Sequence, residues 1–223
     1  MSGIATLERP MYTLPEAARL LRVPTSTLRW WLEGRGDYPP VLRPEPTGST
    51  EVTWGEFVEA GLLREYRDRR VPLQRLRPVI EILRKRFDIP YPLAHFRPFV
   101  GIGRRLLFEA QQIADLPAEL SLVLELVSGQ MVLDSRVDAF LHRVDFSDDE
   151  LQLAQRLHPD GRRSPVVIDP TRSFGAPTLR GIRTDALAEL VQAGEPPELV
   201  AEEYGLTPDE LKAALAYEWQ PAA

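Results

Sequence analysis

The sequence contains no cysteine among its 223 residues. This absence excludes a disulfide framework and a metal site built on thiolates. Long apolar runs are also missing, because no stretch approaches the roughly 20 apolar residues of a membrane-spanning helix. No apolar run follows a basic start at the N-terminus, as a secretory signal would require. We therefore expect a soluble, cytoplasmic protein without membrane contact.

Histidine is scarce, and the three residues are too widely spaced to predict a shared metal site. The Gly-x-Gly at 101–103 lacks the rest of a dinucleotide-binding motif and is interpreted as a hairpin turn. The acidic stretch 147–150 is interpreted as the start of a helix that runs to about residue 157, not as a cation site. No Ser, His and Asp constellation is apparent. We therefore predict a protein that is not an enzyme, with no catalytic residue, metal or cofactor.

Lysine is also rare, since only Lys85 and Lys212 stand among the 27 basic residues. The charge is divided unevenly along the chain. Residues 1–105 carry 18 basic and 12 acidic side chains, a net charge of +6, whereas residues 106–223 carry 9 and 21, a net charge of −12. A basic half is typical of a nucleic-acid-binding protein. The acidic half would repel phosphate and indicates either a basic protein partner or an ordinary solvated surface.

The apolar spacing predicts a mainly α-helical fold with small β elements. After eleven residues without periodicity, which we expect to be frayed, helices are expected at 14–21, 25–32, 54–66 and 73–87. The Pro- and Gly-rich segment 35–52 holds short extended pieces around a turn at Thr47-Gly48, which predicts a two-stranded wing. We therefore predict a winged helix-turn-helix domain over residues 1–87.

The second predicted helix begins with short hydroxyl side chains. In a helix-turn-helix this end enters the major groove, where such side chains approach phosphates or base edges, and an arginine reaches a phosphate or a guanine edge. Arg35 and the turn at Thr47-Gly48 would clamp the flanking DNA backbone. The predicted DNA-binding residues are Thr25, Ser26, Thr27, Arg29, Trp30, Arg35, Thr47 and Ser49. The alternative is a helical module that packs the aromatic residues of this helix, Trp30 and Trp31, in its core and never contacts DNA.

A family resemblance supports the DNA-binding interpretation. The stretch EAARLLRVPTSTLRWW resembles the start of MerR-type domains, with the pattern Ala-x-x-x-Gly-Val-x-x-x-Thr-Leu-Arg-x-Trp. Six positions match: Ala18, Val23, Thr27, Leu28, Arg29 and Trp31. Arg22 stands where the family has glycine. The resemblance implies DNA contact for Arg29 and core packing for Trp31, but no long coiled-coil helix or cysteine effector site follows.

The remaining chain is predicted to form two further domains. Residues 88–160 read as a bridging and dimerisation module with α and β elements: strands near 93–96, 105–108 and 130–133, and a short helix at 117–126. Residues 161–223 read as a helix-turn-helix-like domain of three helices after a short β run at 166–168. These helices are expected at 185–193, 197–204 and 208–219, with Gly194 and Gly205 as C-caps and Pro197 and Pro208 in first turns.

A second resemblance covers residues 164–219. The segment has a β run with Asp-Pro, a Gly-x-Pro, an Arg-Gly-x-Arg, a helix ending in glycine, and two Ala-x-x-Tyr motifs. The matching residues are Ile168-Asp169-Pro170, Gly175, Pro177, Arg180-Gly181-Ile182-Arg183, Gly194, Tyr204 and Ala214–Tyr217. This pattern resembles the DUF433 domain of bacterial VapB-type antitoxins. The resemblance implies a PIN-like ribonuclease toxin as the partner.

PIN-like toxins hold Mg²⁺ with clustered carboxylates, and an antitoxin arginine can pair with such carboxylates in a bidentate manner. The predicted toxin-binding residues are therefore Arg172, Phe174, Arg180, Ile182 and Arg183. Alternatively, Arg180 and Arg183 cap the fold internally by bonding carbonyl groups or Asp169. The acidic helices could also cover a basic RNA-binding surface on the toxin.

Together these patterns predict a type II antitoxin that neutralises a PIN-like, VapC-type ribonuclease and binds operator DNA to repress its own operon. A homodimer or a toxin–antitoxin hetero-oligomer is expected, because dimers match palindromic half-sites. The main alternative is a stand-alone MerR-like transcription regulator without a toxin. A pure protein-docking scaffold is a third possibility.

Overall fold

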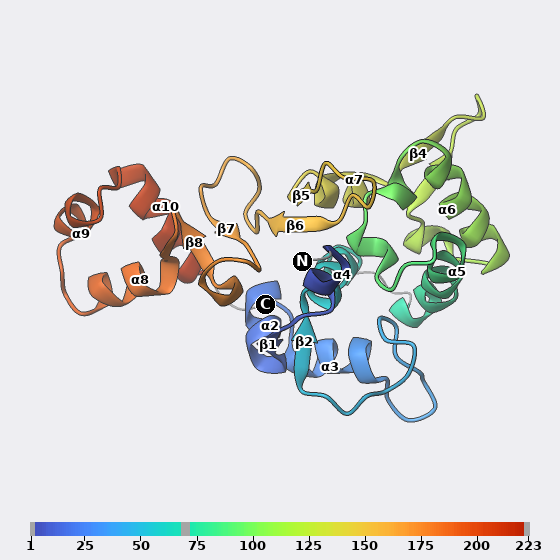
Figure 1. The fold of residues 1–223 in the computed structure, drawn as a ribbon, viewed down its shortest axis with the longest axis horizontal. Helices are drawn as coiled ribbons and strands as arrows, with labels where there is room; N and C mark the ends of the chain where they lie inside the picture. The colour runs from blue at the N-terminus through green and yellow to red at the C-terminus, as the bar shows by residue number, and fades with distance from the viewer. Residues whose placement is uncertain (1–2, 68–71, 221–223) are drawn as a thin grey trace. The chain divides into compact units, whose positions relative to one another are not determined.

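The computed structural model describes residues 3–67 and 72–220, and its fold is α+β, with helices and small sheets (Figure 1). The chain forms two compact units. Unit 1 runs to Leu141 and also holds Phe146–Ala154, whereas unit 2 holds His142–Asp145 and the chain from Gln155 onward. The division into domains at 87/88 and 160/161 stays a prediction, and its outer limits, residues 1 and 223, lie outside the described residues.

Unit 1 begins with a helix and a strand that the apolar spacing does not predict, followed by three helices that it does predict. The elements are α1 (Gly3–Leu7), β1 (Pro10–Thr13), α2 (Leu14–Leu21), α3 (Thr25–Glu33), β2 (Glu51–Thr53) and α4 (Trp54–Arg64). Thr13 caps α2, and Thr53 forms a capping box with Glu56 at the start of α4. Every residue from Trp54 to Leu63 is buried, so α4 is the central helix of this unit.

The predicted wing within residues 35–52 is wrong. That segment contributes β2 alone, and the partner strand is β1 (Tyr12↔Val52), whose first two residues lie in the part expected to be frayed. Burial explains the pairing, because Tyr12 and Val52 are both buried and the Tyr12 ring lies 4.7 Å from the Phe57 ring of α4. Pairing with β1 thus covers α4, which a hairpin within 35–52 would not do.

The middle of the chain is more helical than its sequence predicts. It holds the 3₁₀ helices η1 (Leu73–Leu76), η2 (Pro92–Ala94), η3 (Arg97–Phe99) and η4 (Ala118–Leu120), the α-helices α5 (Arg77–Phe87), α6 (Gly101–Ile113) and α7 (Ser135–Leu141), and a β3–β4 hairpin (Val123–Glu125 and Met131–Leu133). The strand near 130–133 is confirmed. The strands near 93–96 and 105–108 are wrong, and the helix at 117–126 is reduced to η4.

Gly103 explains why α6 replaces the predicted hairpin turn. A Cβ atom at this position would lie 1.9 Å from the Arg97 carbonyl oxygen, so only glycine lets the helix approach η3 so closely. The buried residues Gly103, Leu107, Ala110 and Gln111 then follow helical spacing. Gly101–Gly103 therefore begins a helix.

The helix predicted for 147–157 is also wrong. Asp149 closes a tight turn instead, because its Oδ1 accepts hydrogen bonds from the Ser147 hydroxyl (2.6 Å) and from the backbone N–H groups of Leu151 and Gln152. The chain then enters strand β6 (Ala154–Leu157). Asp and Ser favour such local turns as readily as helix starts.

Unit 2 consists of a sheet, apart from the strand residues Phe146 and Ala154, followed by three helices. The strand order is β5 (Val144–Phe146), β6, β7 (Val167–Ile168), β8 (Pro177–Leu179) and β9 (Ile182–Arg183). A 3₁₀ turn, η5 (Ser173–Gly175), lies between β7 and β8. The helices are α8 (Thr184–Gln192), α9 (Pro197–Glu203) and α10 (Pro208–Glu218), which confirms the three predicted helices (Figure 1).

The helices of unit 2 surround their own core. Leu179, Leu187, Val200, Leu211 and Ala214 are among its buried members. Gly194 and Gly205 have φ of +102° and +63°, as the predicted left-handed C-caps require. Local capping signals and core packing therefore agree in this region.

Candidate functional sites

The exposed side of α3 is the first candidate site. Its opposite side packs inward through Leu28, Trp31 and Leu32, which agrees with the core packing implied for Trp31. The outer side forms an open surface groove lined by Ser26, Thr27, Arg29, Trp30, Gly34 and Arg35. Thus four of the predicted DNA-binding side chains, and the arginine after the helix, lie together on one surface. Thr25 is half-buried at the helix start.

Polar groups in this groove are available to a ligand. The side chains of Arg29 and Arg35 are exposed, and no ion pair with a described residue involves either guanidinium. The indole Nε1 of Trp30 is buried and has no hydrogen-bond partner within the described chain. The groove therefore offers hydroxyl and guanidinium donors to a ligand.

The turn between α2 and α3 has the geometry of a glycine turn. Arg22 adopts φ +53° and ψ +45°, the left-handed region, at the position where the MerR-type pattern has glycine. The Val23 N–H donates to the Ala18 carbonyl (3.0 Å), and Arg67 Nη1 donates to the Arg22 carbonyl (3.2 Å). The substitution of arginine for glycine therefore leaves the turn intact.

Thr47 and Ser49 are engaged within the protein. Glu33, at the end of α3, accepts hydrogen bonds from the backbone N–H groups of Thr47 (2.9 Å) and Gly48 (2.8 Å) and from the Thr47 hydroxyl. Ser49 Oγ accepts from the Glu51 N–H. Burial disfavours the Glu33 carboxylate, but the bonds from Gly48 and Thr47 and the nearby Arg43 lower its pKa below the usual value. The hydrogen bonds of Thr47 and Ser49 thus hold the segment after α3 in place.

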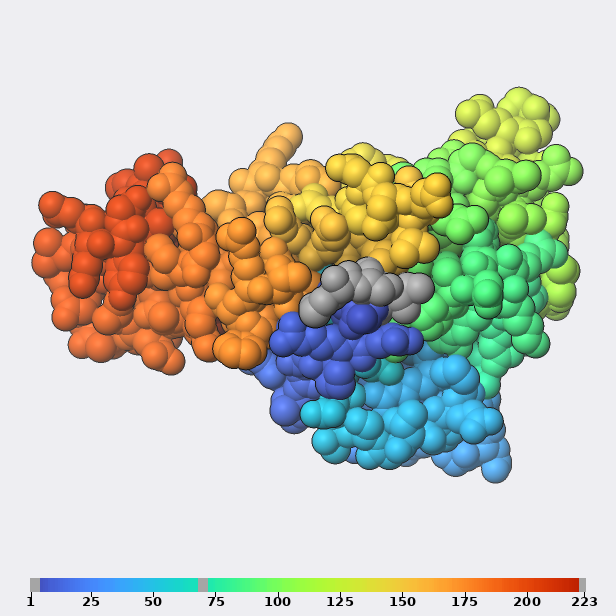
Figure 2. All heavy atoms as spheres, viewed as in Figure 1, coloured from blue at the N-terminus to red at the C-terminus, as the bar shows by residue number. Residues whose placement is uncertain are grey.

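Arg43 is the centre of this network and was not predicted from sequence. Its side chain is almost fully buried. Arg43 Nε donates to Glu56 Oε1 (2.7 Å), Nη1 pairs with Glu33 and donates to Thr47 Oγ1 (2.6 Å), and Nη2 donates to the Glu51 carbonyl (2.8 Å). The network links α3, residues 43–51 and α4. Figure 2 shows the segment after α3, in light blue, at the surface of the molecule.

The second candidate site lies on unit 2, at the β8–β9 hairpin and the loop before it. Leu179 pairs with Ile182, so Arg180 and Gly181 form a two-residue turn with φ of +52° and +86°. The Arg180 side chain is 58% exposed. It donates to the Gly205 carbonyl (3.2 Å) and pairs with Glu210 (2.8 Å), which ties the hairpin to the start of α10.

The loop from Asp169 to Gly175 presents an aromatic side chain to solvent. Ser173, Phe174 and Gly175 all have positive φ, and Phe174 is 82% exposed. A non-glycine residue in this region is strained. Asp169, buried below, accepts bonds from the Thr171 N–H (2.8 Å) and hydroxyl (2.6 Å). Burial opposes its ionisation, but the Thr171 bonds and Arg156 lower the pKa of Asp169.

The structure brings together some of the predicted toxin-binding residues. Arg172 and Arg180 line one hollow, together with Arg156, Pro165, Val167, Asp169, Thr178 and Gly181. Arg172 is 68% exposed and lies 3.9 Å from Asp169. Arg183 instead pairs with Asp185 (2.5 Å), and Ile182 is half-buried. Sequence reasoning missed Arg156, whose Nε donates to Asp169 Oδ2 (3.0 Å), because nothing in its local sequence marks it.

Residues 3–67 and 72–220 contain neither a membrane-spanning helix nor a metal-binding group of side chains. None of the helices there has the length and apolar character needed to span a bilayer. Within the same ranges, His, Asp and Glu side chains form no group of three or more that could hold a metal ion.

Part of unit 2 has a sequence typical of a known protein family. The profile of the family "Protein of unknown function (DUF433)" matches residues 166–217, which cover β7 to α10. This match confirms the DUF433 part of the second resemblance. Arg172, Arg180 and the exposed Phe174 lie within the matched segment, whereas Arg156 and Pro165, which also line the hollow, precede it.

The whole chain resembles proteins of Mycobacterium tuberculosis. It is 38% identical over 226 residues to "Uncharacterized protein Rv2308", with 97% of this chain and 93% of the relative covered. It is 34% identical over 224 residues to "Putative antitoxin VapB45", with 92% of each covered. The crystal structure of Rv2018 matches with a TM-score of 0.75 and 33% identity, over 93% of this chain and 98% of that chain. The chain therefore belongs to the family of these mycobacterial proteins.

Proposed function

We propose that this protein is an antitoxin that neutralises a PIN-like ribonuclease and binds operator DNA to repress its own operon. The observation that carries the proposal is the exposed Phe174, held on a strained loop between Arg172 and Arg180 within the DUF433 region. The antitoxin name of one full-length relative supports this assignment. The DNA-binding half depends on the α3 groove and on the MerR-like pattern.

Arg172 is the arginine best suited to enter a toxin's carboxylate cluster. It is the most exposed of the three candidates, and its distance to Asp169 is the longest of their ion-pair distances. Arg180 and Arg183 already pair with Glu210 and Asp185, which supports the alternative that they stabilise the fold. Phe174 would serve as the apolar anchor beside Arg172, since exposed aromatic residues often dominate binding energy. Charged pairing and apolar burial would thus act together.

A ribonuclease inhibition assay with the partner toxin tests the proposed toxin neutralisation. We expect Arg172→Ala and Phe174→Ala each to weaken inhibition at least about tenfold, because both would lose contacts at the centre of the interface. Arg163→Ala is the matched control, since it removes another exposed arginine of unit 2 outside the hollow. Equal inhibition by all variants, or none by the unaltered protein, would refute the assignment.

The α3 groove would contact the operator. The hydroxyl groups of Ser26 and Thr27 and the guanidinium of Arg29 would face DNA from α3, and Arg35 would hold the flanking backbone. Thr47 and Ser49 would act through the position of their segment, because their polar groups are bonded internally. A homodimer formed through residues 88–160, or a hetero-oligomer with the toxin, would match two half-sites.

A salt titration of binding to the DNA upstream of the protein's own gene tests the proposed operator binding. Log affinity is expected to fall with log salt by about 0.9 per phosphate contact, and Arg29→Ala to lower affinity and reduce that slope by about one contact. Arg105→Ala is the control in the same basic half, because this side chain is 75% exposed and lies on α6. If Arg29→Ala behaves as Arg105→Ala does, α3 is a structural helix.

The α3 groove also favours a second candidate function, a stand-alone MerR-like transcription regulator. Its lining residues belong to unit 1 alone and need no toxin. Operator binding that depends on Arg29, together with no ribonuclease inhibition, would select this candidate.

A further inference from the structure

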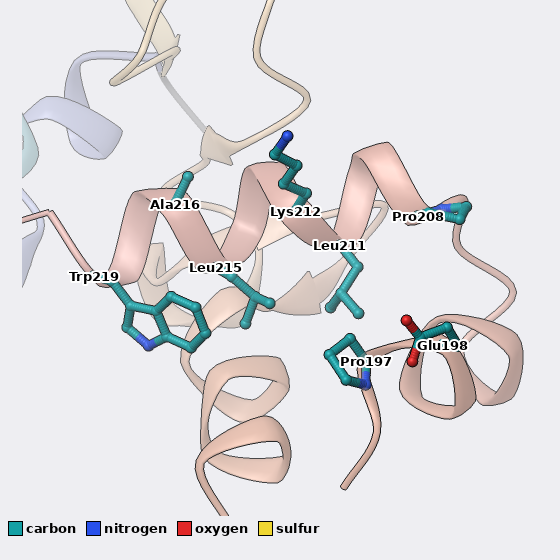
Figure 3. A pocket seen from close by; sticks show the side chains of 8 residues that line it. All are labelled: Pro197, Glu198, Pro208, Leu211, Lys212, Leu215, Ala216 and Trp219. Carbon is teal, nitrogen blue, oxygen red and sulfur yellow. The ribbon is translucent and has the colours of Figure 1, made fainter. Parts of the chain in front are cut away.

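Helices α9 and α10 leave an open apolar groove that the proposed arginine contacts do not use (Figure 3). Its volume is about 470 Å³, which is room for several apolar side chains. The residues that line it are Pro197, Glu198, Pro208, Leu211, Lys212, Leu215, Ala216 and Trp219. None of them lines the hollow around Asp169. The groove is therefore a separate surface of unit 2.

One face of α10 forms the floor of the groove. Leu211, Leu215 and Trp219 follow one another at a spacing of four residues, so their side chains lie in a row. Leu211 and Leu215 are buried, whereas the Trp219 side chain is 51% exposed at the end of the row. In Figure 3 the Lys212 side chain points away from this row. A large aromatic side chain at the end of an apolar row is typical of a protein-binding surface.

The surroundings of the groove are strongly acidic. Residues 184–219 contain nine Asp and Glu residues but a single basic residue, Lys212. Two of these carboxylates pair with arginines, Asp185 with Arg183 and Glu210 with Arg180. Six others are exposed and form no ion pair with a described residue: Glu189, Glu195, Glu198, Glu202, Glu203 and Asp209. A ligand with positive charges beside an apolar stripe would complement both features.

We propose that this groove binds a basic amphipathic helix of the partner toxin. Leucine-like side chains of that helix would pack against Leu211, Leu215 and Trp219, and its Lys or Arg residues would face the exposed carboxylates. This inference rests on the proposed antitoxin function for the identity of the partner. A helix is the fitting occupant, because an apolar groove between helices takes anchors at i, i+3/i+4 and i+7. The toxin is thus held at two separate surfaces of unit 2.

Peptide binding to the full chain tests the groove directly. The probe is a fluorescein-labelled amphipathic helix of about 15 residues, with leucines on one face and lysines on both flanks. The matched comparator has glutamate in place of every lysine. We expect saturable fluorescence polarisation with the lysine peptide, weakened by salt, and at least tenfold weaker binding of the glutamate peptide. Equal binding of the two peptides, or no binding of either, would overturn the proposal.

Two charge-matched variants locate the binding. Ala216→Arg adds a cationic side chain at a residue that lines the groove, on the same side of α10 as Lys212 in Figure 3. Ala193→Arg adds the same charge to an exposed position of unit 2 outside the groove. We expect at least a tenfold loss of lysine-peptide affinity for Ala216→Arg and less than a twofold change for Ala193→Arg. Equal losses would overturn the proposal, because they would reflect net charge alone.

Two further readouts separate this proposal from its premises. If the lysine peptide binds in the groove but the protein does not inhibit the ribonuclease, the antitoxin function fails while the groove's ligand chemistry is supported. If Arg172→Ala abolishes inhibition and neither peptide binds, the groove assignment fails alone. If sedimentation shows a dimer that Ala216→Arg dissociates, a second copy of this chain occupies the groove and the proposal is overturned.

Discussion

At the scale of single residues, Arg22 has an unusual backbone. Its φ of +53° places a residue with a Cβ in the left-handed region, at a cost of about 1 kcal/mol relative to glycine. The turn is nevertheless fixed by the Val23–Ala18 hydrogen bond and by Arg67, which binds the Arg22 carbonyl. The packing of α2 and α3 therefore compensates the strain.

We expect Arg22→Gly to raise the free energy of unfolding by about 1 kcal/mol, because it removes this strain. Arg22→Ala is the control, since it deletes the same side chain but keeps the Cβ. Chemical denaturation of the two variants measures the difference. Equal stability of the glycine and alanine variants would show that the backbone at Arg22 is not strained.

Glu59 is the second residue with an unusual environment. It lies on α4 with no exposed surface, and its Oε2 has no hydrogen-bond partner among the described residues. Burial raises the pKa of Glu59 to about 7, although Arg84, 4.0 Å away, and the Leu93 N–H oppose the shift. The folded protein therefore keeps this proton at pH values where the unfolded chain has lost it.

This raised pKa gives stability a defined pH dependence. Between the ordinary value of 4.5 and about 7, the contribution of Glu59 to the free energy of unfolding falls as the pH rises. A glutamine at this position does not titrate. As the pH rises over this range, the free energy of unfolding of Glu59→Gln is therefore expected to increase relative to that of the unaltered protein, by up to about 3 kcal/mol. Denaturation of both proteins from pH 5 to 8 measures this.

The comparison with Glu59→Gln also removes the effect of His95. Burial lowers the pKa of His95, so this residue makes stability rise with pH up to its ordinary value of 6.5, opposite to Glu59. Both proteins carry His95, and the difference between them reports Glu59 alone. A difference that does not change with pH would mean that Glu59 is ionised in the folded protein throughout.

At the scale of secondary-structure elements, the helices that could be predicted are those whose ends are marked by capping residues, prolines or glycines in the local sequence. Helices α2, α4 and α10 each follow a threonine that caps them. Proline stands at the starts of α9 and α10, and glycine follows the ends of α8 and α9. These signals lie within a few residues of the elements they define. The three helices of unit 2 were therefore found with boundaries within a residue or two.

Elements that depend on distant partners could not be predicted. β2 pairs with β1, which lies before α2 and α3 in the chain, and only burial against α4 selects that pairing. Likewise, α6 depends on a close approach of Gly103 to Arg97, which looks like a turn signal in the sequence. Pairing and close packing are properties of the folded chain, and periodicity does not report them.

The same division holds for the candidate sites. Arg29 and Trp31, or Arg172 and Arg180, belong to continuous motifs and were named from sequence. Arg156 and the Arg43 network reach their partners across many residues, so no local pattern indicates them. The pairing of Arg183 with Asp185 agrees with the alternative in which this arginine stabilises the fold.

At the scale of the whole molecule, each unit has its own buried core. The core of unit 2 is built from residues between Leu179 and Leu215, whereas α4 is the buried helix of unit 1. Units with separate cores can open with different free energies. Damage to one core should therefore affect the protection of its own helices first.

We expect Leu187→Ala, which truncates a fully buried side chain of unit 2, to cost about 2–4 kcal/mol of local stability. Hydrogen exchange measured by mass spectrometry should then show faster exchange in α8–α10 and unchanged exchange in α4. Val58→Ala in α4 is the reciprocal variant and should give the opposite pattern. Equal acceleration in both units would mean that the chain unfolds as one cooperative unit.

The ion-pair network of Arg43 and Glu33 has a consequence for kinetics. Residues 43–50 contain no helix or strand, yet Arg43 and Glu33 bind the backbone of Thr47, Gly48 and Ser49 and the Thr47 hydroxyl. The segment therefore loses its conformational entropy during folding, not at the encounter with a ligand. A ligand that contacts it meets a preorganised surface, and the gain appears mainly as a slower dissociation rate, that is, a longer residence time.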